Sequence, residues 1–275
     1  MTNIHAGFGV NTYSYTFDGT GFDTVARLAD QGYGGVELMF FPGHLWPAEL
    51  SASDLRKLRD LCERRLRLVA VNMPNIDMNV AAAAEEMRSY TLGLLVQFVR
   101  CSGELGAKGI IIGPGKANPL FPMPRERMMS HFYRALDQLA PLAREAGTRL
   151  LVENMPFAFM PDAEALMQAV DGYGDDTIRV IYDVANAHFI GEAPVSGLRR
   201  VRGRLDLVHF SDTTRKVYKH DPFGRGDVPL EGLAEAMREV GYAGIPMLEV
   251  ISRQPDVDIS DSCRLLRQAG IGRLP

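Results

Sequence analysis

The segment RLLVENMP, residues 149–156, combines a short apolar run with a carboxylate at its end. A run of this length that is bounded by polar residues and proline is typical of a buried β-strand. Glu153 stands at the end of the expected strand, where an unpaired buried charge would be costly. The segment therefore predicts both a strand and a partner for Glu153.

Seven other short apolar runs follow the same pattern, and most of them end in Asn, Gly, Pro, Asp or Ser. They cover residues 7–14, 34–40, 67–74, 108–115, 178–187, 205–212 and 245–250. Between them, apolar residues spaced by three and four, with capping residues at the ends, predict helices. The predicted helices cover residues 22–32, 51–65, 81–106, 124–147, 162–170, 196–203, 230–241 and 260–270.

This alternation predicts an α/β fold, a (β/α)₈ TIM barrel that forms a single domain over residues 1–275. An open doubly wound sheet is the alternative. It is weakened because no glycine-rich phosphate loop follows the first strand.

Composition narrows the class of protein. The net charge is −4, which argues against a protein that binds the phosphate backbone of a nucleic acid. Three widely spaced cysteines, Cys62, Cys101 and Cys263, do not suggest a disulfide framework or a zinc–thiolate site. The N-terminus lacks the pattern of a signal peptide, and no apolar run approaches the roughly 18 residues of a membrane span. We therefore expect a cytoplasmic protein that binds neither membrane nor nucleic acid.

Polar side chains stand at the ends of four successive predicted strands: Glu153, Asp183, His209 and Glu249. The carboxyl ends of barrel strands meet on one face, so these side chains should converge. Three converging carboxylates would repel one another unless a cation lay between them. One such acid alone would more often pair with Lys or Arg or cap a helix. The set of four instead predicts one divalent metal, Mn²⁺ or Mg²⁺ first, with Co²⁺ or Zn²⁺ as alternatives.

With these residues the chain resembles the xylose-isomerase-like TIM-barrel superfamily of sugar isomerases and epimerases, which includes the type-IV apurinic endonucleases. The segments that carry the resemblance are VELMF, LLVENMP, IYDVANAHF, LVHFSDTTR, HDPFGRGDVPLEG and MLEV. The resemblance implies that all four residues bind the metal. It also implies that Glu153 and Glu249 are catalytic and move a proton next to a metal-polarised carbonyl, through an enediolate. It further implies a small carbohydrate substrate and a homodimer or homotetramer.

Departures from the family pattern bear on the choice of activity. Asn72, Gly113, Asn186 and Tyr218 stand where an endonuclease would place further metal ligands. An isomerase or epimerase of a sugar or sugar acid is therefore favoured. The alternatives are a lyase on the same site, such as a dehydratase or a C-glycoside-cleaving enzyme, and, less favoured, an endonuclease or a binding barrel without activity.

Seven residues are candidates for substrate contacts, by resemblance or by their place after a strand. They are Arg215, His188, Asn186, His220, Glu37, His44 and Trp46. His44 and Trp46 follow the second predicted strand, where they could cover the pocket. For Arg215, the alternative is an exposed loop position, and for Glu37 it is an ion pair with a neighbouring basic residue. Apolar residues after Glu153 could shape the pocket, although core packing is favoured; they are Met155, Phe157, Phe159 and Met160.

Overall fold

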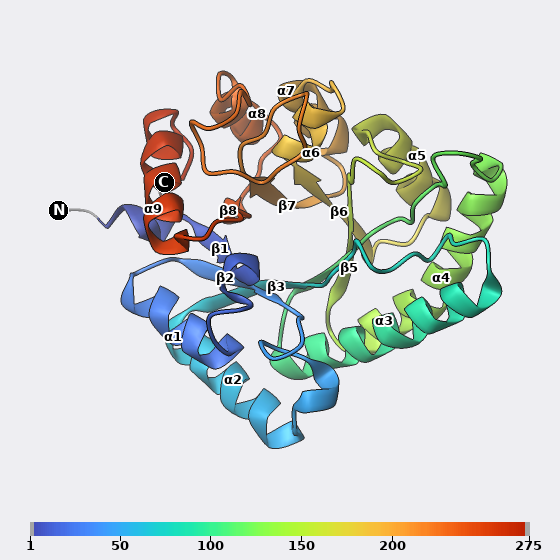
Figure 1. The fold of residues 1–275 in the computed structure, drawn as a ribbon, viewed down its shortest axis with the longest axis horizontal. Coiled ribbons are helices and arrows are strands. Elements are labelled where there is room, and N and C mark those ends of the chain that lie inside the picture. The colour runs from blue at the N-terminus through green and yellow to red at the C-terminus, as the bar shows by residue number, and fades with distance from the viewer. Residues whose placement is uncertain (1–2, 273–275) are drawn as a thin grey trace.

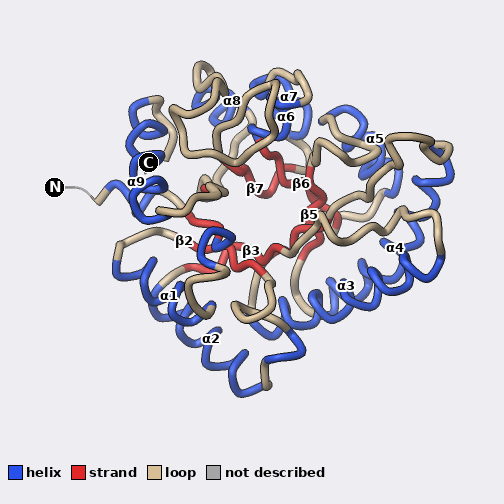
Figure 2. The backbone as a smooth tube through the Cα atoms, in the orientation of Figure 1, coloured by secondary structure: helices blue, strands red, loops and turns tan. Residues whose placement is uncertain are grey.

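Eight parallel strands close into a barrel in chain order in the computed structural model, which describes residues 3–272 (Figures 1 and 2). The strands are β1 (Gly9–Asn11), β2 (Gly35–Met39), β3 (Arg67–Asn72), β4 (Gly109–Ile112), β5 (Arg149–Glu153), β6 (Ile178–Asp183), β7 (Leu205–Phe210) and β8 (Met247–Leu248). The prediction of a single (β/α)₈ barrel is confirmed, and all eight predicted strands are present.

Helices surround the closed strand ring on its outside (Figure 2). They are α1 (Gly21–Asp30), α2 (Ala52–Arg65), α3 (Glu85–Leu105), α4 (Arg125–Glu145), α5 (Ala163–Tyr173), α6 (Val184–Phe189), α7 (Pro194–Val201), α8 (Leu233–Glu239) and α9 (Pro255–Gln268). The sequence did not predict α6, because its apolar residues continue the run of β6. The Asp183 side chain accepts a hydrogen bond from the Asn186 N–H, which ends the strand and begins this helix.

Local signals explain where the first helices begin and where α3 ends. Capping boxes start α1, between Thr20 and Asp23, and α2, between Ser51 and Asp54. Helix α3 ends at Gly106, whose φ of 76° favours glycine over a residue with a side chain. None of the helices within residues 3–272 is long and apolar enough to cross a membrane.

The barrel interior is built in two layers. The lower layer is an apolar cluster filled from six strands by Ala70, Ile111, Leu151, Ile181, Leu207 and Met247. Because side chains alternate along a strand, residues two positions further on face the same interior. Those positions hold Asn72, Gly113, Glu153, Asp183, His209 and Glu249. The apolar layer therefore supports a polar layer at the carboxyl end of the barrel.

A long loop after β7 returns to this polar end and is held by Asp212. The buried Asp212 carboxylate accepts backbone hydrogen bonds from Gly224 and Gly226, both at 2.8 Å, and from Val228 at 3.0 Å. The backbones of Asp212 and Asp221 also pair in both directions, at 2.7 and 2.8 Å. These bonds close the base of the 213–220 segment.

Replacing Asp212 with Ala should lower the free energy of unfolding by about 3 kcal/mol, because several buried N–H groups lose their acceptor. Chemical denaturation measures this change. The exposed Asp18 offers a matched control, and Asp18→Ala should change stability by less than about 0.5 kcal/mol. Equal stability of the two variants would show that the carboxylate does not hold the loop.

Candidate functional site

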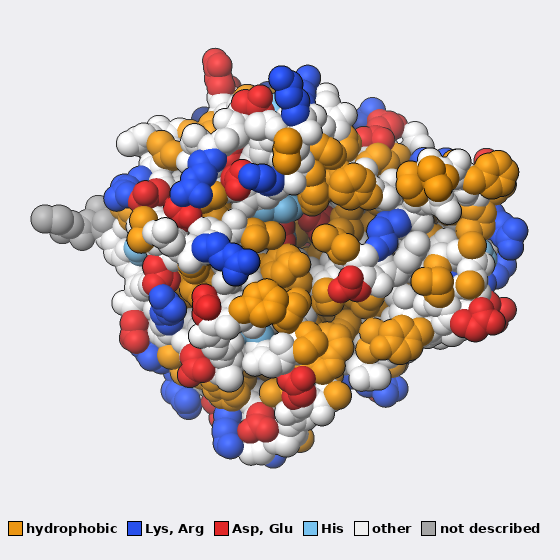
Figure 3. Space-filling model, viewed as in Figure 1, with side chains coloured by type: hydrophobic (Ala, Val, Ile, Leu, Met, Phe, Trp, Pro, Cys, Tyr) orange, Lys and Arg blue, Asp and Glu red, His pale blue; other side chains and the backbone are white. Residues whose placement is uncertain are grey.

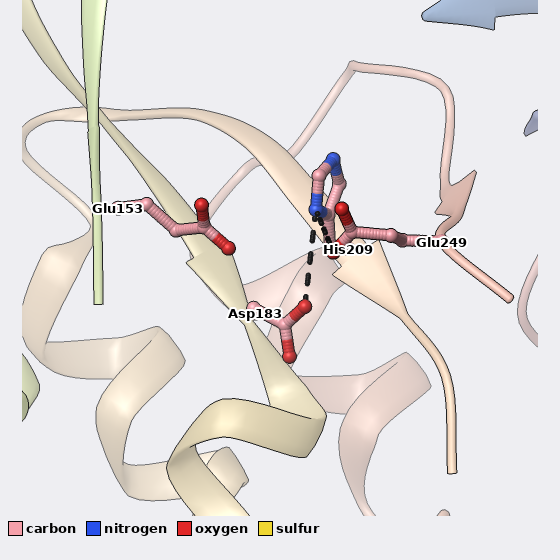
Figure 4. Close-up of side chains that lie close together, drawn as sticks. All are labelled: Glu153, Asp183, His209 and Glu249. Carbon is pink, nitrogen blue, oxygen red and sulfur yellow. Dashed lines mark hydrogen bonds and ion pairs between the residues drawn. The ribbon is translucent and has the colours of Figure 1, made fainter. Parts of the chain in front are cut away.

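Four side chains meet at the carboxyl end of the barrel: Glu153 from β5, Asp183 from β6, His209 from β7 and Glu249 just after β8. One potential ligand atom from each lies within 4.8 Å of those from the others, and all four residues are buried. Figure 4 shows Glu153 and Glu249 reaching toward each other from opposite sides, with Asp183 and His209 between them. The sequence predicted this set, and the fold brings it together.

The ring of His209 is held on both of its nitrogens. Its Nε2 lies 2.7 Å from Glu37 Oε2, and its Nδ1 lies 3.1 Å from Glu249 Oε2. The other Glu37 oxygen accepts hydrogen bonds from the amides of Asn11 and Asn72. A carboxylate behind a histidine fixes the ring and its tautomer, which leaves Nδ1 free to face a metal.

Glu37 is therefore not placed as the sequence suggested. It is fully buried and lies behind His209, outside the residues that line the cavity described below. The alternative, an ion pair with Lys or Arg, is not what the structure shows either, because His209 takes that place. Glu37 positions a candidate ligand instead of contacting the substrate.

The electrostatics of the four residues call for a positive charge. Burial and the nearby Glu249 raise the pKa of Glu153 well above its ordinary value. Burial also raises the pKa of Asp183, although two histidines oppose this. For Glu249 burial acts in the same direction, but His209 and His220 hold its pKa below the ordinary value. The site thus accumulates carboxylates that are costly to ionise together.

Asp183 shows most directly that a cation fits. Its Oδ1 accepts the Asn186 N–H at 2.7 Å, but its buried Oδ2 has no hydrogen-bond partner. A buried oxygen without a donor is destabilising unless another group satisfies it. Oxygen-rich ligation with one imidazole suits a divalent ion, so these four residues could hold one.

A chain of hydrogen bonds extends from Glu153 toward the loop after β7. The Asn186 amide donates to Glu153 Oε1 at 3.1 Å, and Asn186 Oδ1 accepts the Tyr218 hydroxyl at 2.9 Å. Tyr218 Oη also lies 2.8 Å from His220 Nε2, and His220 Nδ1 lies 2.9 Å from Ser211 Oγ. Burial raises the pKa of Tyr218, so its hydroxyl keeps its proton at neutral pH. Asn186 thus contacts the cluster through Glu153, although it is not among the residues that line the cavity described below, whereas His220 lies beside the cluster and lines that cavity.

A cavity of about 390 Å³ opens above the cluster. Its lining residues are Tyr13, Met39, Asn72, Met73, Pro74, Asn75, Ile76, Glu153, Met155, Tyr218, Lys219, His220, Asp221, Glu249 and Ile251. In Figure 3 acidic and histidine side chains are visible in the hollow, and hydrophobic side chains surround it. A cavity of this size can hold a small molecule.

Four expected substrate contacts lie outside the lining of this cavity in the described residues: His44, Trp46, His188 and Arg215. His44 is buried, with Nε2 3.0 Å from Thr12 Oγ1 and Nδ1 2.7 Å from the Gly19 carbonyl. Trp46 packs edge-on against Phe98 at 5.3 Å between ring centroids. Both side chains are therefore used in packing and do not cover the cavity.

The other two residues are turned away from the cavity. His188 is buried, and its Nε2 lies 2.7 Å from Asp227 Oδ1. Arg215 is exposed in the loop after β7, which corresponds to its alternative as a surface arginine. Among the apolar residues after Glu153, Met155 lines the cavity and Phe157 is 59% exposed, whereas Phe159 and Met160 belong to the core.

The sequence interpretation missed several residues of the site. Tyr13, Tyr218 and Ile251 line the cavity, and Asn11 supports Glu37. Asn72, which in the sequence stands out only as a departure from the endonuclease ligands, lines the cavity and donates to Glu37 at 3.0 Å. The signal for Asn11 and Asn72 was available, because both end strands at the same level as the metal-binding set.

Comparison with known proteins identifies the family. The family model described as xylose isomerase-like TIM barrel matches residues 25–269, and the chain belongs to this family.

Individual relatives are distant. The chain is 25% identical over 122 residues to an L-ribulose-5-phosphate 3-epimerase of Shigella boydii, a match that covers 44% of this chain and 43% of the relative. It is 24% identical over 229 residues to a probable endonuclease 4 of Mycobacterium ulcerans, covering 78% of this chain and 85% of the relative. The crystal structure of a D-tagatose 3-epimerase-like protein superposes with a TM-score of 0.81 at 19% identity, covering 95% of this chain and 96% of that one.

Adding Mn²⁺ to the chelator-treated protein should raise its melting temperature, because the native state alone presents the assembled carboxylates. In Asp183→Ala this response should disappear. Glu192→Gln is the matched control, since Glu192 binds the Tyr182 hydroxyl away from the cluster. Its response to Mn²⁺ should equal that of the wild type. A wild-type protein whose melting temperature does not change with Mn²⁺, Mg²⁺, Co²⁺ or Zn²⁺ would contradict the prediction.

Glu37→Gln should weaken Mn²⁺ binding by roughly 10- to 100-fold, because His209 loses the carboxylate that orients its ring. Isothermal titration calorimetry measures the affinity, again with Glu192→Gln as control. An unchanged affinity would mean that Glu37 only fills space below the cluster.

Proposed function

We propose that this protein is a divalent-metal-dependent isomerase or epimerase of a sugar or sugar acid. The observation that carries the proposal is the pair of glutamates, Glu153 and Glu249, that both line the cavity and both belong to the candidate metal cluster. Two carboxylates that approach one volume from opposite sides suit the removal and return of a proton at a single carbon or at two neighbouring carbons.

In the proposed enzyme, Glu153, Asp183, His209 and Glu249 hold Mn²⁺ or Mg²⁺, with Co²⁺ or Zn²⁺ as alternatives. When bound, the cation stabilises negative charge that develops on substrate oxygens. Support comes from the unpartnered Asp183 Oδ2 and from the excess of buried carboxylates.

The protein's own groups would act as follows. One glutamate takes the proton from the carbon next to the substrate carbonyl. For isomerisation the same glutamate returns the proton to the former carbonyl carbon, while the proton of the neighbouring hydroxyl moves to the former carbonyl oxygen. For epimerisation the opposite glutamate, in its acid form, delivers its own proton to the other face of the same carbon. Asn186 donates to Glu153 and holds its carboxylate toward the cavity. Tyr218 and His220 line the cavity next to the cluster, so they can orient a substrate hydroxyl.

A lyase on the same site is the second candidate. His220 Nδ1 lies 3.4 Å from Glu249 Oε2 and the residue lines the cavity. A hydrogen-bonded imidazole at this place could protonate a substituent that leaves the neighbouring carbon after the same first proton transfer. The two candidates differ only in the fate of that substituent.

Endonuclease activity is less favoured despite the endonuclease relatives. Within residues 3–272, one group of three or more His, Cys, Asp or Glu side chains is placed to share a metal ion, and it is the cluster of four described above. Asn72, Gly113 and Asn186 stand where the family resemblance places further ligands. The predicted cytoplasmic location and the predicted dimer or tetramer stay predictions.

Glu153→Gln and Glu249→Gln should each lower turnover by roughly 10²- to 10⁴-fold, because each loses a group that carries the proton. Candidate ketoses and sugar acids are incubated with the Mn²⁺-supplemented protein in D₂O, and mass spectrometry follows deuterium uptake and product formation. Loss of a substituent would assign the lyase, and an isomeric product would assign the isomerase or epimerase. Full turnover in both variants would refute both assignments, while Glu192→Gln should behave as wild type.

A further inference from the structure

The cavity is chemically divided between its floor and its walls. The floor carries Glu153 and Glu249, which belong to the candidate metal cluster, and His220, which lies beside it. The walls are formed largely by apolar side chains, namely Met39, Met73, Pro74, Ile76, Met155 and Ile251. Ile76 is 67% exposed and Ile251 is 42% exposed, so part of this apolar surface faces solvent. A small free sugar could stack its C–H face on an aromatic ring, but it would leave the solvent-facing Ile76 and Ile251 without an apolar partner.

Two clusters of aromatic rings extend the apolar walls outward. Tyr13 lines the cavity, and its ring centroid lies 6.4 Å from that of Phe41. The Phe41 and Phe17 rings meet edge-on, with 5.2 Å between their centroids. Phe17 is 79% exposed. Figure 3 shows hydrophobic side chains gathered around the central hollow on this face.

The second cluster begins at Tyr218. Its ring meets the Phe157 ring edge-on, with 5.4 Å between the centroids, and its centroid lies 5.2 Å from that of Phe189. The Phe157 side chain is 59% exposed. Aromatic and aliphatic surface that continues from a polar floor to the mouth of a cavity fits a ligand with one polar and one apolar end.

The basic side chains near the cavity are paired or lie outside its lining. Lys219 is the lysine among the lining residues, and its Nζ lies 3.6 Å from Asp221 Oδ2. Lys116 Nζ bonds to the carbonyls of Asn75 and Ile76. Arg215 is exposed and is not among the lining residues. A phosphate group is normally recognised by unpaired Arg or Lys or by a cluster of N–H donors, and the described residues of this cavity offer no free cation of this kind.

We propose that the substrate is a sugar without a phosphate group that keeps a carbonyl and carries an apolar substituent, such as an aryl or alkyl glycoside with a ketone on its sugar ring; simple glycosides serve as unreactive binding analogues. The sugar lies on the polar floor and the substituent lies against Ile76 and Ile251, between the two aromatic clusters. This inference rests on the proposed function for the sugar part of the ligand. The preference for the substituent depends on the walls alone.

Binding of matched ligands tests the proposal without requiring turnover. The full chain with Mn²⁺ is titrated calorimetrically with the methyl glycoside, the phenyl glycoside and the 6-phosphate of D-glucose, D-galactose and D-mannose. In at least one sugar series the phenyl glycoside should bind about tenfold more tightly than the methyl glycoside, because the ring buries apolar area against the walls. The 6-phosphates should bind no more tightly than the methyl glycosides.

Variants of the exposed wall assign the effect to these residues. In the double variant Ile76→Ser/Ile251→Ser the ratio of phenyl to methyl glycoside affinity should fall severalfold, because the phenyl ring loses its apolar contacts. Leu120→Ser is the control, since Leu120 is 92% exposed and is not among the lining residues. It should keep the full preference.

Three outcomes would overturn the inference. The first is equal binding of methyl and phenyl glycosides in every series. The second is tightest binding of a 6-phosphate. The third is a wild-type dimer that becomes a monomer in Ile76→Ser/Ile251→Ser while the preference for phenyl glycosides stays unchanged. The last result would assign the apolar rim to a second copy of the chain. Equal binding of methyl and phenyl glycosides would contradict this inference but not the proposed isomerase. Full turnover in Glu153→Gln and Glu249→Gln would contradict the proposed function but not a measured preference for phenyl glycosides.

Discussion

The concentration of buried carboxylates around one imidazole is the constraint on which the rest of the site depends. Glu37, Glu153, Asp183 and Glu249 lie within one small volume, and in residues 3–272 the ion pairs found for them come only from His209 and His220. Two histidines cannot neutralise four ionised carboxylates. The arrangement is therefore best explained by an additional cation, and the unpartnered Asp183 Oδ2 points to the same requirement.

This concentration is possible because the barrel separates its interior into layers. Leu151, Ile181, Leu207 and Met247 fill the lower layer, and each precedes a member of the polar set by two residues. Well-packed apolar side chains below keep water out and fix the strands, so the polar side chains above are held at defined separations. Stability and chemistry are thus assigned to opposite ends of the same strands, as expected for this architecture.

The loops decide what kind of molecule can reach the polar layer. The Asp212 carboxylate ties the long loop after β7, and this loop brings Tyr218 and His220 over the cluster. Apolar residues from the end of β2 and from the segments after β3, β5 and β8 complete the walls. An acidic floor therefore lies under a largely apolar mouth, and in the proposed enzyme the floor would carry the chemistry while the mouth would contact the substituent.

The sequence by itself determined the barrel and the four metal-binding candidates. Both follow from local periodicity: short apolar runs alternate with helical patterns, and the polar residues stand at strand ends where barrel geometry makes them converge. Only the tertiary structure decided the partners of those residues. Glu37 pairs with His209 across 172 positions, and Tyr218 reaches Asn186 across 32. His44 and Trp46, which look like lid residues in sequence, turn inward because Thr12, Gly19 and Phe98 offer hydrogen bonds and a ring face there. Such long-range contacts depend on how separate elements pack, and no local pattern encodes the direction in which a loop side chain turns.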